Sequence, residues 1–476
     1  MKHILLIAGI LFSLNIFAQN QVDILRYSQY QVGGTARSIG YGGAVGSLGA
    51  DFSSLTVNPA GIGLYRKSEM SISPTIYFSN ANATMGDHSA DGFKDNFNLN
   101  QYGAVFVTNT GSKNGWKAFQ FGIGVNRSSN FNHTTNINNE NSKNSLMTDY
   151  IKQANGNHPE DLDRFSTDLA WYNWLIDTIP GGNNTYTSVI ENGGVQQELK
   201  KRNWGSVNEM TLNFGGSYND IVYIGGAIGF PFVRYFEESQ YTEFDAADTI
   251  ANFKSYIRDQ YIETHGNGVN LKIGLIIRPT GFLRFGVAFT SPTWYSMNDT
   301  WNTTITRQFE NGTEDKKSSP HGEYNYDLTT PMKLNASATF TIARFLMISG
   351  DVDYINYTSG RLSARDYAFF EENAAARDLF QPTLNLRAGA EIRLRPLSFR
   401  MGLQRYGNAY KDDLNSTVKY VASAGIGYRT RDFFVDMAYS YAINKSDYYM
   451  YDPNIINASN LDIRENRIVL TTGYKF

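Results

Sequence analysis

The chain of 476 residues contains no cysteine and only 12 prolines. Beyond its first residues it also lacks an apolar run long enough to cross a membrane as a helix. The absence of cysteine excludes a disulfide framework and the attachment of lipid to an N-terminal cysteine. Basic and acidic residues nearly balance, at 42 and 45, so the net charge of -3 gives no reason to expect a nucleic-acid partner.

Patterns that carry catalysis or bind cofactors are missing as well. The glycine-rich stretch 40–49 does not match G-x-G-x-x-G, and Ser47 lacks the glycine two residues earlier that a nucleophile elbow requires. The six histidines are scattered and predict neither a zinc site nor a paired haem site: His3, His88, His133, His158, His265 and His321. We therefore expect no enzyme activity, no cofactor and no metal.

What the chain has in abundance is aromatic residues and glycine, with 31 Tyr, 30 Phe and 43 Gly. Apolar or β-forming side chains recur at every second position, as in Ile468, Leu470, Thr472, Tyr474 and Phe476 at the end of the chain. This alternation is typical of a strand with one face against lipid and the other against a polar lumen. Because only alternate residues meet lipid, a mean hydropathy of -0.38 is compatible with an outer-membrane β-barrel.

Short turns and longer polar stretches alternate along the chain. Six short turns, among them Asn219-Asp220 and Arg395-Pro396, separate seven longer stretches. Short turns on one edge and long loops on the other are the periplasmic and extracellular edges of a barrel. The pattern predicts an all-β transmembrane barrel of about 14 antiparallel strands over residues 68–476. Its long loops are expected at residues 80–95, 132–203, 244–251, 304–322, 363–381, 409–416 and 446–462.

The two segments before the barrel differ in character. Residues 1–18 have the charge, length and small-residue exit of a signal peptide, so we expect export to the outer membrane of a Gram-negative bacterium. Residues 19–67 are rich in glycine and carry apolar side chains that argue for packing rather than for a free tail. A barrel lumen of this size can hold such a segment. We predict that residues 19–67 form a plug, called the hatch below.

Small helices are predicted in the extracellular loops at residues 145–154 and 364–380 and after Pro159. Pro159 stands at a first helical position, with acidic residues in the first turn and Pro180-Gly181 beyond the end. An apolar stripe outside the membrane must be buried on the barrel rim or around a ligand. Its residues are candidates for ligand capture, with plain loop packing as the alternative: Leu162, Phe165, Leu169, Trp171, Tyr172, Trp174 and Ile176.

Several motifs of the chain resemble a known family. The hatch contains Gly34-Thr35-Ala36-Arg37-Ser38, Gly42-Gly43-Ala44, Gly49-Ala50-Asp51 and the hatch motif Asn58-Pro59-Ala60-Gly61. The barrel contains Leu271-Lys272-Ile273-Gly274, Ser291-Pro292-Thr293-Trp294, Asp351-Val352-Asp353-Tyr354 and Arg387-Ala388-Gly389-Ala390-Glu391. These segments are similar to the FadL-type outer membrane transport proteins, the FadL/TodX family, in the branch found in Bacteroidetes.

The resemblance implies a 14-stranded monomer whose hatch closes the lumen. It also implies that hydrophobic ligands are caught among extracellular loops, pass to a pocket beside the hatch and leave sideways where a strand is kinked inward. We interpret Asn58, Pro59, Ala60 and Gly61 as a turn that anchors the hatch, since Asn caps turns and Pro fixes φ; direct ligand contact is the alternative. Charged residues of the lumen are predicted to be ion-paired hatch contacts: Arg37, Asp51, Lys272, Asp351, Asp353, Arg387 and Glu391.

The predicted function is passive uptake of hydrophobic compounds across the outer membrane, with long-chain fatty acids as the expected class. The expected partners are these small molecules together with outer-membrane lipid and lipopolysaccharide. Two alternatives stay open. The barrel could be the outer-membrane partner of a protein secretion system, or a hemin receptor, although the scattered histidines argue against the latter.

Overall fold

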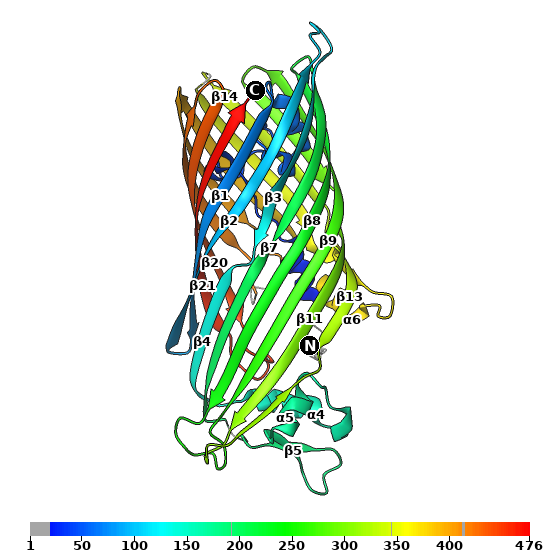
Figure 1. Cartoon of the computed structure of the whole chain (residues 1–476), viewed down its shortest axis with the longest axis vertical. Helices are drawn as coiled ribbons and strands as arrows, with labels where there is room; N and C mark the ends of the chain where they lie inside the picture. Colours follow the sequence, from blue (N-terminus) through cyan, green and yellow to red (C-terminus); the bar gives the residue numbers. More distant parts are fainter. Residues whose placement is uncertain (1–19, 192, 344, 412–414) are drawn as a thin grey trace, which may run out of the picture.

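The computed structural model describes residues 20–191, 193–343, 345–411 and 415–476. The predicted signal peptide, residues 1–18, lies outside these ranges. The described residues form an antiparallel barrel of 14 spanning strands, as the alternation predicts, with the N-terminal segment inside it (Figure 1). The barrel closes where β1 pairs with the last strand, β21, from Glu69 opposite Lys475 to Thr84 opposite Asn460.

Three of the spanning strands are interrupted. A break separates β3 from β4 at Phe131-Asn132, and another separates β10 from β11 at residues 291–293. The next spanning strand is interrupted twice, between β12 and β13 at residues 319–321 and between β13 and β14 at residues 330–332. The last three breaks contain Pro292, Pro320 and Pro331, which cannot donate to a β-ladder. The strands of the barrel sheet are β1 Glu69–Met85, β2 His88–Asn109, β3 Trp116–Asn130, β4 His133–Ser142, β7 Val195–Tyr218, β8 Val222–Phe244, β9 Ser255–Thr280, β10 Leu283–Thr290, β11 Trp294–Gln308, β12 Glu314–Ser318, β13 Gly322–Thr329, β14 Lys333–Ile342, β15 Leu346–Asn356, β16 Arg361–Ser363, β17 Pro382–Leu394, β18 Leu397–Tyr406, β19 Lys419–Arg429, β20 Phe433–Tyr448 and β21 Ser459–Lys475.

The outer surface carries the alternating apolar side chains. On β3 the exposed fraction of Phe119 is 49%, whereas the preceding residue, Ala118, is 1% exposed and faces the lumen. Exposed Phe, Leu, Ile and Met side chains continue around the strands at every second position. Hydrocarbon is the medium that makes such a surface stable, because isolated apolar patches of this extent are unfavourable in water.

Two predicted loops are mostly strand. Residues 304–322 contain the end of β11 and all of β12, which pair with each other. Residues 80–95 are polar and predict an extracellular loop, but most of them belong to β1 and β2, which are joined by a tight turn at Gly86-Asp87. Gly86 adopts a φ of +59°, which favours glycine. Polar residues tolerate strand conformation here because this hairpin extends beyond the apolar part of the wall.

The barrel wall is lower on one side. β15, β17, β18 and β19 have 10 to 13 residues, whereas β8 has 23 and β9 has 26. At the extracellular end of the short strands, the chain forms the helical turn η3 Tyr357–Ser359, the strand β16 and the helix α6 Phe370–Leu379. α6 covers only the second part of the predicted helix at residues 364–380. These elements pack against the N-terminal helix α1, Gln21–Ser28, through a shared apolar cluster.

The N-terminal segment is helical and compact. After α1 it forms α2 Ala36–Gly40, α3 Ser54–Val57 and the 3-10 helix η1 Pro59–Leu64. Its backbone lies so close to the wall that a side chain on Gly402 of β18 would place Cβ 2.1 Å from the Gly42 nitrogen. A Cβ on Gly225 of β8 would lie 2.2 Å from the Pro59 oxygen. Glycine in the wall therefore allows the hatch to dock against it.

The long loop after β4 folds into a small cap at the extracellular end, drawn at the bottom of Figure 1. It contains α4 Leu146–Ala154, the 3-10 helix η2 Pro159–Asp161, α5 Thr167–Tyr172 and the two-stranded sheet β5 Ile176–Thr178 with β6 Tyr186–Ser188. The helix at residues 145–154 is confirmed, with Ser145 as its N-cap. The continuous helix after Pro159 is wrong, because Leu162 is extended and α5 begins only at Thr167. No helix among the described residues is long and apolar enough to cross a membrane.

Candidate functional site

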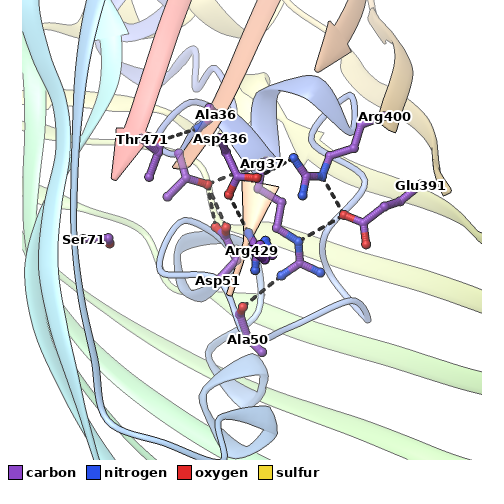
Figure 2. A network of polar contacts seen from close by, with 12 residues as sticks. Ala36, Arg37, Ala50, Asp51, Ser71, Glu391, Arg400, Arg429, Asp436 and Thr471 are labelled. Carbon is purple, nitrogen blue, oxygen red and sulfur yellow. Dashed lines mark hydrogen bonds and ion pairs between the residues drawn. The ribbon is translucent and has the colours of Figure 1, made fainter. Parts of the chain in front are cut away.

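Ionic contacts join the hatch to the wall near the periplasmic end. Arg37 of α2 points to the adjacent wall, where its Nε lies 3.4 Å from Oε2 of Glu391 on β17, while its Nη1 donates to the Ala50 oxygen at 2.9 Å (Figure 2). Glu391 also accepts from Arg400 at 2.6 Å, and Arg400 in turn contacts Asp436 at 2.8 Å. Arg37 thus ties two segments of the hatch to an ion network on the wall.

The predicted lumen charges all lie inside the barrel, and most of them are paired. Arg387 binds Asp353 at 2.7 Å and lies 3.9 Å from Asp351, which accepts from the backbone nitrogen of Gly46 at 2.8 Å. Lys272 pairs with Glu209 of β7. Asp51 differs from the prediction, because it bonds the Thr35 hydroxyl at 2.8 Å and the Ser53 nitrogen at 3.0 Å rather than a cation.

The hatch motif lies where the hatch meets β8, β9 and β10. The Asn58 side chain accepts from the Ala60 nitrogen at 3.0 Å and caps η1, with Pro59 as the first residue of that turn. Its amide nitrogen lies 3.4 Å from the carbonyl oxygens of Leu275 and Val287. A Cβ on Gly274 would lie 2.0 Å from the Asn58 side-chain oxygen. These contacts, together with Gly61 packed against Gly49, favour the anchoring role over direct ligand contact.

A cavity of about 70 Å³ lies in the lumen beside the segment that joins α1 to the rest of the hatch. Its apolar surface comes from aromatic and aliphatic side chains, including Tyr27, Tyr30 and Val207. Its charged lining is Glu209, Lys272 and Lys333. Lys272 is neutralised by Glu209, whereas the Lys333 ammonium lies 4.2 Å from the centre of the Tyr30 ring. The cavity therefore combines an apolar wall with a cation that an anionic group can approach.

Two of the cavity's charged residues were missed by the sequence reasoning. Glu209 and Lys333 stand at lumen-facing positions of β7 and β14. A charged residue at the lumen-facing position of a strand was the available signal, since the same rule selected Lys272. The network residues Arg400 and Asp436 follow it too, with buried side chains on β18 and β20.

The wall is split between β2 and β3. β2 pairs with β1 as far as Met85 opposite His88, but its pairing with β3 runs only from Asn109 to Gln101. Beyond this point the chain of β3 bends inward, and β4 pairs with β7. β4 touches the inner side of the β1–β2 hairpin instead, where Asn136 donates to the Asp91 oxygen at 2.8 Å. Between Asn100 and Asp91, β2 has no strand paired on this side among the described residues.

The seven predicted capture residues separate into two groups in the cap. Leu162, Leu169 and Ile176 are buried in the apolar core of the cap, against which Trp171 packs. Phe165 contacts the Trp301 ring of β11, with centroids 5.6 Å apart. Tyr172 and Trp174 are 52% and 60% exposed. The structure thus brings the predicted stripe into one cap but presents only these two aromatic side chains prominently to solvent.

The exposed position of Trp174 is fixed by its backbone conformation and by hydrogen bonds from Arg307. Its φ of +57° is unusual for a bulky residue, and the Arg307 guanidinium of β11 holds this turn by donating to the carbonyl oxygens of Asn173 and Trp174. Arg307 also donates to the Asn252 oxygen at 2.7 Å, so a second loop takes part. Nearby, the Lys317 ammonium lies 4.3 Å from the Tyr172 ring centre. No group of three or more metal-ligating side chains was found in the part of the chain that the structure describes.

Comparison with known proteins gives a likeness of structure rather than of sequence. No protein-family model and no curated protein sequence matches the chain. A FadL homologue from Pseudomonas aeruginosa matches with a TM-score of 0.57 and 12% identity, over 94% of this chain and 100% of its own. The toluene transporter TodX of Pseudomonas putida matches with a TM-score of 0.55 and 11% identity, over 94% and 100% of the two chains. The Ralstonia pickettii toluene transporter TbuX matches with a TM-score of 0.50 and 13% identity, over 94% and 99%.

At these identities the matches describe the fold. They extend over nearly the whole length of both chains. The chain therefore has the fold of the FadL-type outer-membrane barrels.

Proposed function

We propose that this protein carries hydrophobic compounds passively across the outer membrane, with long-chain fatty acids as the substrate class. The observation that carries the proposal is the cavity beside Tyr30, inside a barrel whose axial path is filled by the hatch. Apolar molecules cross a sugar-rich outer leaflet poorly, and an apolar path through a protein bypasses it. Diffusion down a gradient is sufficient, since nothing in the proposal requires an energy source.

The lining of the cavity supports an amphiphilic ligand. The aromatic rings of Tyr27 and Tyr30 and the side chain of Val207 offer apolar contact. Lys333 has no ion-pair partner among the described residues and stands at the edge of the same space, over Tyr30. A carboxylate would gain a charge-assisted hydrogen bond from such an ammonium group, whereas a pure hydrocarbon would leave it unused. This combination favours a fatty acid over a compound such as toluene, which the name of TodX indicates for that protein.

Two further features support a route to and from the cavity. Tyr172 and Trp174 give the cap an exposed aromatic surface that suits first contact with an apolar ligand. The separation of β2 from β3 gives the wall a weak side, and Ser128 of β3 lines both the cavity beside Tyr30 and a smaller one at the separation. A lateral exit there would let the ligand leave without passing the ion network of the hatch.

The test is direct binding together with blockage of the cavity. The barrel, purified in mild detergent, should hold fatty acid at close to one molecule per chain when its extract is examined by mass spectrometry. Val207→Trp should fill the cavity and lower fatty-acid binding and uptake, because added side-chain volume there has no other space. Val269→Trp is the matched control, since Val269 on β9 faces outward and is 38% exposed. Stoichiometric bound protein with no bound lipid, or unchanged uptake by Val207→Trp, would contradict the proposal.

A further inference from the structure

A groove of about 360 Å³ lies on the outer surface of the barrel, over β17, β18, β19 and β20. Most of its lining residues stand at outward-facing positions of these strands, so the groove opens toward the membrane and is separate from the cavities of the lumen. The outward residues form two rows across the strands, namely Ala388, Leu403, Ala422 and Tyr441 in one row, and Leu386, Arg405, Tyr420 and Ile443 in the next row toward the extracellular end.

Small side chains between larger ones give the groove its shape. On β19, Ala422 lies opposite Leu403, and the next outward residue, Ala424, lies opposite Met401. Leu403 and Met401 form a high ridge on β18, since they are 64% and 63% exposed. On the other side, Tyr441 of β20 lies opposite Ala422. The two ridges are two strand spacings apart, about 10 Å, so the trough between them follows β19 and has a width that suits one acyl chain.

Arg405 stands at the extracellular end of this trough. In the strand register it lies between Leu386 of β17 and Tyr420 of β19, on the face that meets lipid. The lining of the groove contains no carboxylate, and Arg405 makes no ion pair with any residue that the structure describes. The other arginine of the lining, Arg387, is paired with Asp353 inside the barrel. Arg405 is therefore a cation without a counter-charge at the end of an apolar trough.

The length of β18 places Arg405 at the outer boundary of the apolar zone. β18 has 10 residues and starts at the short turn Arg395-Pro396, and Arg405 is its last residue but one. With a rise of about 3.4 Å per residue and a tilt of about 40°, such a strand covers about 25 Å of bilayer, which is the height of the apolar band of an outer-membrane barrel. Tyr420, which lies opposite Arg405, occupies a position typical of the aromatic girdle at this boundary. The Arg405 guanidinium therefore lies at the level of the head groups of the outer leaflet.

We propose that this groove, named the outer-wall groove, binds lipopolysaccharide of the outer leaflet. An acyl chain lies in the trough over Ala422, and a phosphate of the lipid anchor accepts hydrogen bonds from the Arg405 guanidinium, whose paired donors match phosphate oxygens. Charge complementarity selects this occupant, because a neutral lipid or an apolar protein surface would leave Arg405 without a counter-charge. The level of Arg405 selects the leaflet. The outer-wall groove lies outside the barrel, so this inference goes beyond the proposed function and does not depend on it.

The experiment titrates the intact, delipidated barrel in non-ionic detergent with three lipids. These are lipid A, which is the phosphorylated acyl anchor of lipopolysaccharide, the same lipid A after removal of its phosphates, and phosphatidylglycerol. Native mass spectrometry measures the number of bound lipids and their affinities for the wild type, for Arg405→Gln and for Ala422→Phe, which fills the trough. A heat-modifiable band on gels confirms that each variant is folded.

Each variant has a matched control on the outer surface. Arg464→Gln is the control for Arg405→Gln, because Arg464 also faces outward, on β21, but already has a counter-charge in Asp462 at 3.1 Å. Ala104→Phe is the control for Ala422→Phe, because Ala104 stands on the outward face of β2 between Tyr102 and Phe106 and lies outside the groove.

The wild type should bind one lipid A per chain and prefer it to the form without phosphates by about fivefold, the effect of a single arginine near an anionic membrane surface. Arg405→Gln should lose this preference and keep its affinity for the form without phosphates. Ala422→Phe should weaken the binding of both forms, and the two control variants should behave as the wild type.

Three results would overturn the proposal. They are a wild type that does not bind lipid A, an Arg405→Gln variant that keeps the preference, and an Ala422→Phe variant that binds both forms as the wild type does. A wild type that binds phosphatidylglycerol as tightly as lipid A would overturn the assignment to lipopolysaccharide. None of these results bears on fatty-acid binding in the lumen, which is measured separately.

Discussion

Arg37 and Glu391 are 354 residues apart in the chain, yet their side chains meet in the lumen and join the hatch to β17. Glu391 is the common partner of three guanidinium groups, those of Arg37, Arg393 and Arg400. Replacing its charge leaves these groups without their shared counter-charge in an interior where such a loss costs about 3 to 5 kcal/mol. We expect Glu391→Gln to loosen the hatch while the strands stay paired. Denaturant unfolding and conductance in planar bilayers measure the two effects.

The control for Glu391→Gln is Asp462→Asn, which removes an exposed ion pair with Arg464. Such surface pairs contribute between 0 and about 1 kcal/mol. Equal stability and equal conductance of the two variants would show that the Arg37 contact does not hold the hatch.

Substitution of Gly402 tests whether the hatch is held in place by the close approach of its backbone to the wall. A Cβ at this position would lie 2.1 Å from the Gly42 nitrogen and 2.3 Å from its Cα, so Gly402→Ala must displace the hatch or strain β18. Overpacking of this kind costs about 1 to 3 kcal/mol. Gly350→Ala is the control, since the nearest atom to its Cβ would be 3.9 Å away. We expect raised conductance or a lower unfolding midpoint for Gly402→Ala only.

Deletion of residues 33–63 removes most of the hatch and leaves α1 joined to β1. At its periplasmic end the wall is closed by strand pairing alone, with β2 on β3 and β1 on β21, so we expect the barrel to fold without this segment. Permeability to small polar solutes should rise, because the lumen charges would then line an aqueous channel. Single-channel conductance measures the change. A closed deletion variant would contradict the assignment of residues 33–63 as the plug.

Substitutions in the cap distinguish a packing role from a ligand-capture role for the residues of the predicted stripe. Leu169 has no exposed surface, so Leu169→Ser should destabilise the cap by about 2 to 5 kcal/mol. Trp174 is 60% exposed, and Trp174→Ser should change stability by less than about 0.5 kcal/mol. If the exposed aromatic surface captures ligand, Trp174→Ser slows uptake at low ligand concentration. Unchanged uptake by Trp174→Ser and Tyr172→Ser would leave the stripe with a packing role alone.

The barrel could be predicted from the sequence because its strands carry a local signal. Most spanning strands show their lipid face in the sequence itself, as at Phe119 and Phe121, and connection lengths give the order. The hatch was also predictable in kind, since glycine and apolar residues before the first strand argue for packing. The fold class and strand order can therefore be predicted from the period of the apolar residues and the lengths of the connections alone.

The contacts that build the site could not be predicted in the same way. Nothing near Arg37 in the chain points to Glu391. At the inward bend after Asn126, β3 stops pairing with β2 but keeps its pairing with β7, and no local sequence signal marks this change. The prediction of a continuous helix after Pro159 is wrong because a bent loop can bury an apolar stripe as well as a helix can. The segment between Asp163 and Ser166 forms its own side-chain hydrogen bonds instead, including Ser166 to Asp163.

The pH response of the cap tests a single pair, Lys152 of α4 and Asp452 of the last loop, whose atoms lie 2.8 Å apart. Burial alone would raise the pKa of the Asp452 carboxyl, but hydrogen bonds from Lys152 and Asn454 outweigh burial and hold that pKa below its usual 3.8. A carboxyl with a lowered pKa stabilises the fold above its unfolded pKa and ceases to do so as the pH falls through the folded value. Burial raises the pKa of Asp149 on α4 itself, so the quantity that isolates Asp452 is the difference in α4 hydrogen-exchange protection between the wild type and Lys152→Met, which should be present from pH 7 to about pH 4 and be lost below it. Lys152→Met should lower this protection already at pH 7, whereas Lys200→Met, which removes an exposed cation near Glu198, should not. Protection of α4 that is independent of pH down to about 2 would show that Asp452 does not hold the cap.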